Sequence, residues 1–364
     1  MKKEKIYKEN FKAIKFPKDE QKHNHTIEWW YFNGNLKNKS GKNFSYMNCL
    51  FSAKPKRIGL PFLKNIPIEN LFFSHYFVGD NKKYLKKRIN PFCIMDENSF
   101  TKPLLWANYD NSCLIEETEP FKYRVVNDFV DLSLVSEKKP LLLNKNGFFD
   151  LKNKTTYYYT LSRLKTKGMI RIKDKWEEVE GLSWMDHQWA QAPATDNDKW
   201  TWFSMHLNNG EDLICFIYGD TIKTSYAGIC GKGGETRHTE NVIFTPSESP
   251  SGNKNSGAKY CLEYNIDIPD FDARLKITPL RRDQEITFGS IEYWEGGIKI
   301  KGNIGKEKVE GLGFEEIVKT TKSKKIIAPI WKLLRSRSIM ENIKNFSAFS
   351  VKTVYFLSKE IIKK

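Results

Sequence analysis

Residues 181–190 of the chain read GLSWMDHQWA. The stretch is rich in aromatic residues and has no apolar period of 3.6 residues, so it is typical of a β-strand and not of a helix. Alternate side chains of a strand point to the same face. We therefore expect Trp184 and Asp186 to share one face of this strand. His187 and Trp189 then share the opposite face, so acid and histidine point to different sides.

A second strand-like segment, residues 26–36, reads TIEWWYFNGNL. By the same alternation, Glu28 and Trp30 point to one face of the predicted strand. Trp29 and Tyr31 point to the other. This segment also places an acid beside an aromatic ring.

A third segment, residues 291–302, reads IEYWEGGIKIKG and places Tyr293 and Glu295 on one face, with Trp294 on the other. An acid among aromatic rings loses hydration, so its pKa rises and it can keep its proton near neutral pH. The ring faces can also stabilise a developing cation. The alternative is that the rings form core and the acids pair with buried Arg, Lys or backbone amides. The sequence leaves both interpretations open.

The same organisation continues from about residue 26 to residue 320. Short runs of alternating apolar and polar residues are separated by Gly, Asn, Asp and Pro, which is the pattern of antiparallel strands. Aromatic residues make up 14% of the chain, and they favour pleated, half-buried surfaces. The sequence therefore predicts an all-β fold. Further clear examples of strand-like runs are residues 44–51, 71–78, 157–164, 201–207, 212–219, 260–268 and 271–279.

The length of 364 residues exceeds what one compact core usually supports, so we expect two β-domains. The segment AQAPATDNDKW, residues 190–200, separates two strand-rich halves. We place the domains at residues 20–190 and 198–321, after an N-terminal extension of residues 1–19. A basic amphipathic helical tail, residues 323–364, completes the predicted organisation.

The predicted tail differs from the rest of the chain in charge and in period. The formal net charge is +16, and from Lys322 to Lys364 eleven basic residues accompany only two acidic ones, which gives +9. Apolar residues recur there at helical spacing. Such a helix can lie on an anionic membrane, or it can cover apolar surface of a domain or a partner. Recognition motifs do not accompany the basic residues, so we expect no nucleic-acid partner.

The chain shows no sequence signal for membrane insertion or export. No stretch approaches the roughly twenty apolar residues of a spanning helix. The basic N-terminus lacks the apolar run of a signal peptide. The six cysteines lie far apart without a C-x-x-C pair, which predicts reduced, buried thiols. We therefore expect a cytoplasmic protein, peripheral to a membrane if the tail binds one.

Four of the six histidines are candidate metal ligands. His23 and His25 form an H-x-H pair and could bind a metal together with His75 or His187. No third ligand stands at a diagnostic spacing, so we expect no metal site. His75 and His187 fit orienting donors or proton shuttles as well as they fit hydrogen-bonded core residues. No phosphate loop or dinucleotide fingerprint occurs, and we expect no cofactor.

Five strings of the sequence together resemble one family. They are EWWYFNGNL (28–36), FFSHYFV (72–78), GLSWMDHQWA (181–190), YWEGG (293–297) and GLGFEE (311–316), in the order of the AttH-like, lipocalin-like hydratase family. That family includes carotenoid 1,2-hydratase (hydroxyneurosporene synthase), kievitone hydratase and fungal decalin-forming Diels-Alderases. The chain departs from the usual family residues at Asn35, Ala190, Phe314 and Lys319-Thr320.

The resemblance implies two packed, lipocalin-like antiparallel β-barrel domains and no obligatory cofactor. It leaves the reaction open, because members of the family hydrate or cyclise different substrates. Our first hypothesis is a hydratase- or cyclase-type enzyme, a hydro-lyase similar to carotenoid 1,2-hydratase if it hydrates. It would act by acid catalysis on an alkene of an apolar, isoprenoid-like small molecule. The alternative is a non-catalytic, lipid-binding carrier, and a third hypothesis is a scaffold for the tail.

In the enzyme hypothesis Asp186 is the general acid that protonates the alkene. Glu28, Glu295 or His187 positions water or takes the proton back. The carrier hypothesis predicts an Arg or Lys within hydrogen-bond reach of each motif acid, whereas the enzyme hypothesis predicts one acid without such a partner. The side chains expected to bind the substrate are Trp29, Trp30, Tyr31, His75, Trp184, Trp189, Tyr293 and Trp294.

Overall fold

The computed structural model describes residues 13–54, 69–109, 113–151, 154–191, 199–219, 223–252, 258–288 and 291–320. The tail predicted for residues 323–364 and most of the N-terminal extension lie outside them. Within these ranges the only helical elements are the 3-10 turns η1 (Lys18–Glu20), η3 (Leu143–Lys145) and η4 (Pro269–Phe271). No helix found there is long and apolar enough to cross a bilayer.

The first sheet is 12-stranded and antiparallel. Its strands are β1 (Ile27–Asn38), β2 (Asn43–Ala53), β3 (Leu71–Asp80), β4 (Leu85–Cys93), β5 (Trp106–Tyr109), β6 (Cys113–Glu119), β7 (Lys122–Asn127), β8 (Val130–Ser136), β9 (Leu141–Leu142), β10 (Phe148–Asp150), β11 (Thr155–Ile172) and β12 (Lys175–Ala190). The order is β4-β3-β2-β1-β12-β11-β8-β7-β6-β5, with β9 and β10 paired to β11. The neighbouring strands β1 and β12, inside the sheet, therefore carry two of the three acid-containing segments.

The second sheet is 10-stranded and antiparallel. Its strands are β13 (Trp200–Leu207), β14 (Asp212–Tyr218), β15 (Thr224–Cys230), β16 (Thr236–Thr239), β17 (Ile243–Pro246), β20 (Tyr264–Ile268), β21 (Ala273–Pro279), β22 (Glu285–Phe288), β23 (Ile291–Ile304) and β24 (Glu307–Thr320). The order is β16-β15-β14-β13-β24-β23-β21-β20-β17, with β22 paired to β23. The strands β18 (Ser251–Gly252) and β19 (Lys259–Tyr260) form a separate pair.

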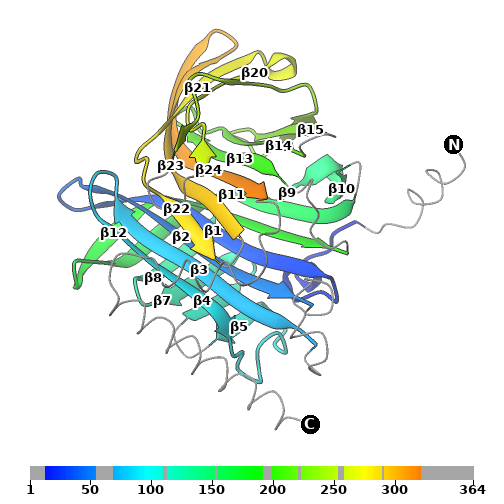
Figure 1. The fold of residues 1–364 in the computed structure, drawn as a ribbon. Helices are drawn as coiled ribbons and strands as arrows, with labels where there is room; N and C mark the ends of the chain where they lie inside the picture. Colours follow the sequence, from blue (N-terminus) through cyan, green and yellow to red (C-terminus); the bar gives the residue numbers. More distant parts are fainter. Residues whose placement is uncertain are drawn as a thin grey trace, which may run out of the picture.

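Both sheets are curled into half-barrels, and Figure 1 shows the second sheet, in green to orange, above the first, in blue to green. Met95, just beyond β4, forms an isolated bridge with Tyr109 of β5, so the edges of the first sheet meet at one point. The prediction of an all-β, antiparallel fold is confirmed, and the two expected β-barrels are curled half-barrel sheets in the structure. The expected helical tail lies outside the described residues. The first sheet draws all its strands from one side of the segment 190–200, and the second sheet from the other.

Side-chain alternation divides most of the described interior into three large cores. Trp30 and Phe32 of β1 point into the curl of the first sheet. Tyr31, between them, points toward the second sheet and joins a core that lies between the two sheets. A third core fills the curl of the second sheet, with Phe203 and Ile266 among its members. The core between the sheets holds the candidate site, because aromatic and acidic residues from both sheets meet there.

An ion cluster also joins the two sheets. A bulge in β11 between Leu161 and Leu164 interrupts the pairing with β12. Arg163, within this bulge, places Nη2 2.6 Å from Oδ1 of Asp212 on β14. Lys138 Nζ lies 2.6 Å from Oδ2 of the same carboxylate, whose side chain is 0% exposed. Two cations from the first sheet thus hold a buried anion of the second.

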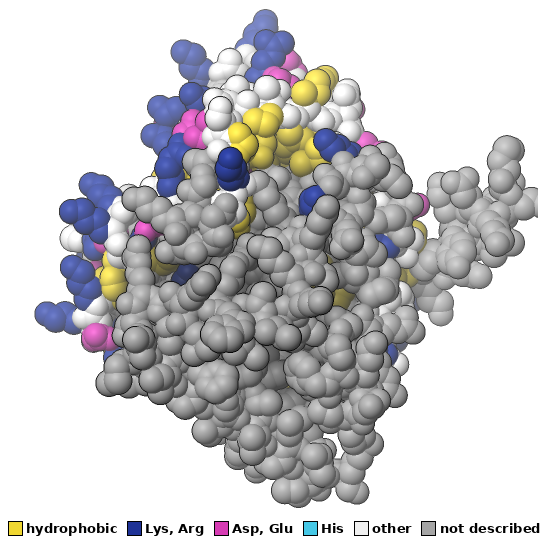
Figure 2. Space-filling view, viewed as in Figure 1, with side chains coloured by type: hydrophobic (Ala, Val, Ile, Leu, Met, Phe, Trp, Pro, Cys, Tyr) yellow, Lys and Arg dark blue, Asp and Glu magenta, His cyan; other side chains and the backbone are white. Residues whose placement is uncertain are grey.

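The remaining basic side chains are mostly at the surface. On the face shown in Figure 2, Lys and Arg side chains stand along the left and upper margins of the described surface, with acidic residues among them. The described part of this face therefore shows scattered charge.

All six cysteines are buried and form no disulfide.

Candidate active site

Asp186 lies on β12, on the face directed at the second sheet, and is 3% exposed. The Tyr158 hydroxyl donates to Oδ2 at 2.7 Å. Trp184 Nε1 donates to Oδ1 at 2.7 Å. Burial raises the pKa of Asp186 to about 7, and the hydrogen bonds from Tyr158 and Trp184 offset part of that rise. The carboxyl group thus has neutral donors only and is poised to exist in either protonation state.

Aromatic rings of both sheets surround this carboxyl group. Trp202 of β13 donates its Nε1–H to the Tyr158 oxygen at 2.9 Å, which links the second sheet to the acid. The Trp202 ring meets the Trp184 ring edge-on at 6.3 Å. It meets Tyr31 edge-on at 5.6 Å. Aromatic rings, rather than bulk solvent, therefore form the surroundings of Asp186.

Two further acids, Glu295 and Glu316, lie directly opposite each other on β23 and β24. The Tyr31 hydroxyl donates to Glu295 Oε1. Trp200 Nε1 donates to Glu316 Oε1 at 2.5 Å. Burial, followed by the charge of Glu316, raises the pKa of Glu295 well above its usual range. Burial raises the pKa of Glu316 to about 7. Because like charges in a dry site repel, this carboxyl pair retains at least one proton at neutral pH.

His75 of β3 reaches the same core. Its Nδ1 lies 2.6 Å from the Tyr293 hydroxyl, and the two rings stack at 5.8 Å. Burial lowers the pKa of His75 to about 3, so the imidazole is neutral. Cys49 lies opposite His75 in the register of β2 and β3. Its thiol is buried, and burial raises the pKa of a thiol, whereas it lowers that of an imidazole. The site as a whole therefore contains weak acids, a neutral imidazole and aromatic rings.

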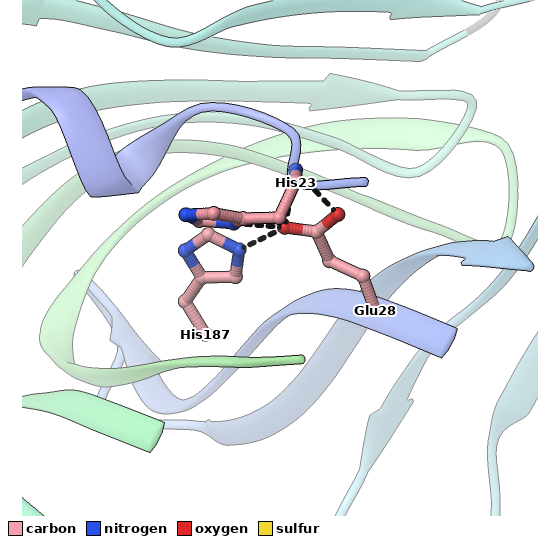
Figure 3. Close-up of side chains that lie close together, drawn as sticks. All are labelled: His23, Glu28 and His187. Atoms are coloured by element: carbon pink, nitrogen blue, oxygen red, sulfur yellow. Dashed lines mark hydrogen bonds and ion pairs between the residues drawn. The ribbon is translucent and has the colours of Figure 1, made fainter. Parts of the chain in front are cut away.

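Glu28 and His187 lie elsewhere. They occupy the opposite face of the first sheet, inside its curl, where His187 Nε2 lies 2.9 Å from Glu28 Oε1. Figure 3 shows that His23 joins them, with Nδ1 2.7 Å from the same oxygen. Trp30 and Trp189 contact the rings of this group. The structure thus brings Asp186 together with Glu295 and separates it from Glu28 and His187.

The two remaining tryptophans differ in position. Trp29 is partly buried and packs against the core between the sheets. Trp294 points away from that core, packs with Tyr260 and Ile317, and donates its Nε1–H to the Arg282 carbonyl at 2.7 Å. The sequence predicted that Trp294 binds the substrate together with Tyr293. In the structure Tyr293 and Glu295 face the core that holds Asp186, whereas Trp294 does not.

Sequence reasoning also missed members of the site. Glu316, Tyr158 and Trp202 contact it, yet none was a candidate. Glu316 ends the string GLGFEE at residues 311–316, whose weak specificity hid its role. Tyr158 and Trp202 lie on ordinary strand-like runs, so only the pairing of β11 with β12 and the docking of the second sheet reveal them.

Comparisons with known proteins identify the family and the fold. The family model described as AttH-like matches residues 7–319. Kievitone hydratase of Fusarium solani subsp. phaseoli is 24% identical over 182 residues, which is 47% of this chain and 51% of that protein. The chain thus matches about half the length of this curated relative.

Two solved structures share the fold. A protein described as AttH from Nitrosomonas europaea superposes with a TM-score of 0.72 and 23% identity, covering 86% of this chain and 98% of that one. Kievitone hydratase from Nectria haematococca superposes with a TM-score of 0.67 and 18% identity, covering 85% and 94%. With the family match spanning nearly the whole chain, this protein belongs to the AttH-like family.

Proposed function

We propose that this protein is a hydratase-type enzyme, a hydro-lyase that adds water to an alkene of an apolar, isoprenoid-like substrate by acid catalysis between the two sheets. Cyclisation of such an alkene would use the same first step. Membership of the AttH-like family and similarity to kievitone hydratase support hydratase-type activity. The observation that carries the proposal is a buried carboxyl group, Asp186, whose hydrogen-bond donors are all neutral.

The partners of the acids favour the enzyme over the carrier. In the described ranges, the side-chain partners of Asp186, Glu295 and Glu316 are Tyr and Trp donors, and no Lys or Arg pairs with any of the three. The chain itself shows the contrasting case, because buried Asp212 is held by Lys138. Paired cations favour a charged carboxylate, whereas a proton donor must keep its proton.

The proposed reaction assigns a role to each group. The Asp186 carboxyl transfers its proton to one alkene carbon, which leaves a cation on the other. The faces of Trp184 and Trp202 stabilise that cation. Water adds to the cationic carbon, and a deprotonated member of the Glu295–Glu316 pair accepts the proton that water releases. A final proton transfer restores Asp186, so the net change is the addition of one water molecule.

Substrate access follows from the burial pattern. Asp186, Glu295 and Trp184 are 3%, 1% and 0% exposed, so the acids are closed off from solvent in this structure. Trp29 and Phe51 are only partly buried where they pack against the same core. An apolar ligand would enter past these two rings and displace them. Exclusion of water then strengthens every electrostatic interaction in the site.

A product assay tests the proposed function. Full-length protein is incubated in ¹⁸O-labelled water with kievitone, the compound named in its relative, and with any apolar molecule that native mass spectrometry finds on the purified protein. A hydratase gives a product heavier by one labelled water. Recovery of every bound ligand unchanged would favour the carrier.

A further inference from the structure

Three side chains of metal-binding type converge inside the curl of the first sheet, on the face away from Asp186 (Figure 3). His23 precedes β1, Glu28 lies on β1 and His187 on β12. One ligand-type atom from each residue lies within 4.8 Å of the others. We infer that these residues form a binding site for one divalent transition-metal ion. Zn²⁺ fits best, because two imidazoles and one carboxylate form a known zinc ligand set.

Both histidines have an outer partner for the nitrogen that faces away from Glu28. His23 Nε2 lies 3.5 Å from Asp19 Oδ1. His187 Nδ1 lies 3.3 Å from the Tyr159 hydroxyl. When His23 Nδ1 and His187 Nε2 bind the ion, the remaining N–H groups donate to these two partners. Metal-binding histidines almost always carry such a partner, which fixes the tautomer and the ring orientation.

The three ligands are also held in place by packing. The His23 ring stacks on Trp189 at 3.8 Å with an interplanar angle of 8°. The His187 ring stacks on Trp30 at 4.8 Å. The backbone N–H of His23 donates to both Glu28 oxygens, at 2.9 Å to Oε2 and at 3.1 Å to Oε1, which fixes the carboxylate beside the two imidazoles. The site is therefore largely formed before an ion arrives.

Size and access suit a small ion. Ligand atoms at about 2.0–2.1 Å from a tetrahedral zinc lie about 3.3 Å apart. The present distances to Glu28 Oε1 are 2.7 Å from His23 and 2.9 Å from His187, so a shift of about half an ångström admits the ion. His23 is 17% exposed and lines a surface cavity of about 420 Å³ together with Asp19. The cavity gives an entry path and leaves the fourth position for water.

The site was not evident from the sequence, because Glu28 stands at no diagnostic spacing from His187. The pairing of β1 with β12 places the two residues together. The inference is independent of the proposed hydratase function, since His187 and Asp186 point to opposite faces of the sheet. The bound ion would tie the segment before β1 to the two central strands.

Zinc binding is tested on untagged, full-length protein that has been treated with a chelator. Zn²⁺ is titrated against a coloured competing chelator, and we expect one ion per chain. His23→Gln removes the partly exposed ligand and should abolish this binding. Asp19→Asn, which removes an outer partner, should weaken it by about 10- to 100-fold. His238→Gln, on β16 of the second sheet, is the matched control and should bind as the wild type does.

Thermal unfolding with and without Zn²⁺ provides a second measurement, because an ion that binds only the folded state raises the melting temperature. The wild type and His238→Gln should gain stability with Zn²⁺, and His23→Gln should not, although it still unfolds cooperatively. Absence of stoichiometric binding by the wild type would overturn the inference. Equal binding by His23→Gln and His238→Gln would do so as well, and the group would then be a hydrogen-bonded network only.

Discussion

Tyr158 donates its hydroxyl hydrogen to Asp186 across β11 and β12 at 2.7 Å, and its oxygen accepts the Nε1–H of Trp202 from the second sheet at 2.9 Å. One hydroxyl therefore connects the candidate proton donor to the docking of the two sheets. The position of the carboxyl group depends on both sheets, although the acid itself belongs to the first.

Tyr158→Phe tests this connection. The substitution removes the donor to Asp186 and leaves the Trp202 N–H without its acceptor. We expect a loss of about 1–3 kcal/mol in the free energy of unfolding, because a buried polar group loses its partner. We also expect a lower turnover, because the carboxyl group is no longer held toward the core. Denaturant unfolding and the product assay measure the two effects, and unchanged values of both would remove Tyr158 from the site.

Asp212→Asn tests the ion cluster between the sheets. The substitution leaves Lys138 and Arg163 partly buried without their anion, and breaking such a buried pair costs about 3–5 kcal/mol. Asp131→Asn is the matched control, because its partner Arg124 is 47% exposed and Asp131 is 41% exposed. An exposed pair contributes about 0–1 kcal/mol. Denaturant midpoints of the two variants should differ clearly, and equal midpoints would show that the cluster does not hold the sheets together.

Glu20 predicts a specific dependence of stability on pH. Burial, followed by the neighbouring Glu117, raises the pKa of Glu20 from 4.5 to about 9. The folded state therefore holds a proton that the unfolded state releases. This contribution is fully present below pH 4.5 and is lost as the pH rises toward about 9. Glu20→Gln removes the titration. The melting temperature of the variant minus that of the wild type should therefore increase as the pH rises from 5 to 9. A constant difference across that range would contradict the protonated state of Glu20.

The basic tail, residues 323–364, remains a proposal from the sequence. If its lysines bind lipid phosphates, full-length protein should sediment with anionic vesicles and not with neutral ones, and high salt should release it. Protein that ends at Thr321 should stay in the supernatant. Equal sedimentation of both forms would remove the tail from membrane binding and favour a role in covering apolar protein surface.

Much of the fold could be predicted from the sequence because strand alternation is a local property. The period of two placed Trp30 and Tyr31 on opposite faces, and the structure shows them in different cores. It separated Asp186 from His187 in the same way. The division of the domains at residues 190–200 stays a prediction, although the strands of the first sheet all precede Trp200 and those of the second all follow Ala190.

The site could be predicted only in part, because its geometry depends on strand register and on how the sheets dock. The alternation separated Asp186 from His187, but it could not show that Glu28 lies with His187 or that Glu295 comes to Asp186. Glu295 faces Glu316 through the register of β23 and β24, which no local pattern encodes. Trp294 lies on the face opposite Tyr293 and Glu295, as the alternation placed it, but the sequence could not show which of the two faces meets the first sheet.

The role of Asp186 is tested most directly by deuterium incorporation. Full-length protein and Asp186→Asn are incubated in D₂O with the same alkene substrate, and ligand binding is measured alongside. The wild type should give a product with one deuterium on the former alkene carbon that receives the proton, beside the carbon that receives water. Asp186→Asn should bind the substrate with nearly the same affinity and form no labelled product, because the amide cannot supply the proton. Labelled product formed by Asp186→Asn at the wild-type rate would contradict Asp186 as the proton donor.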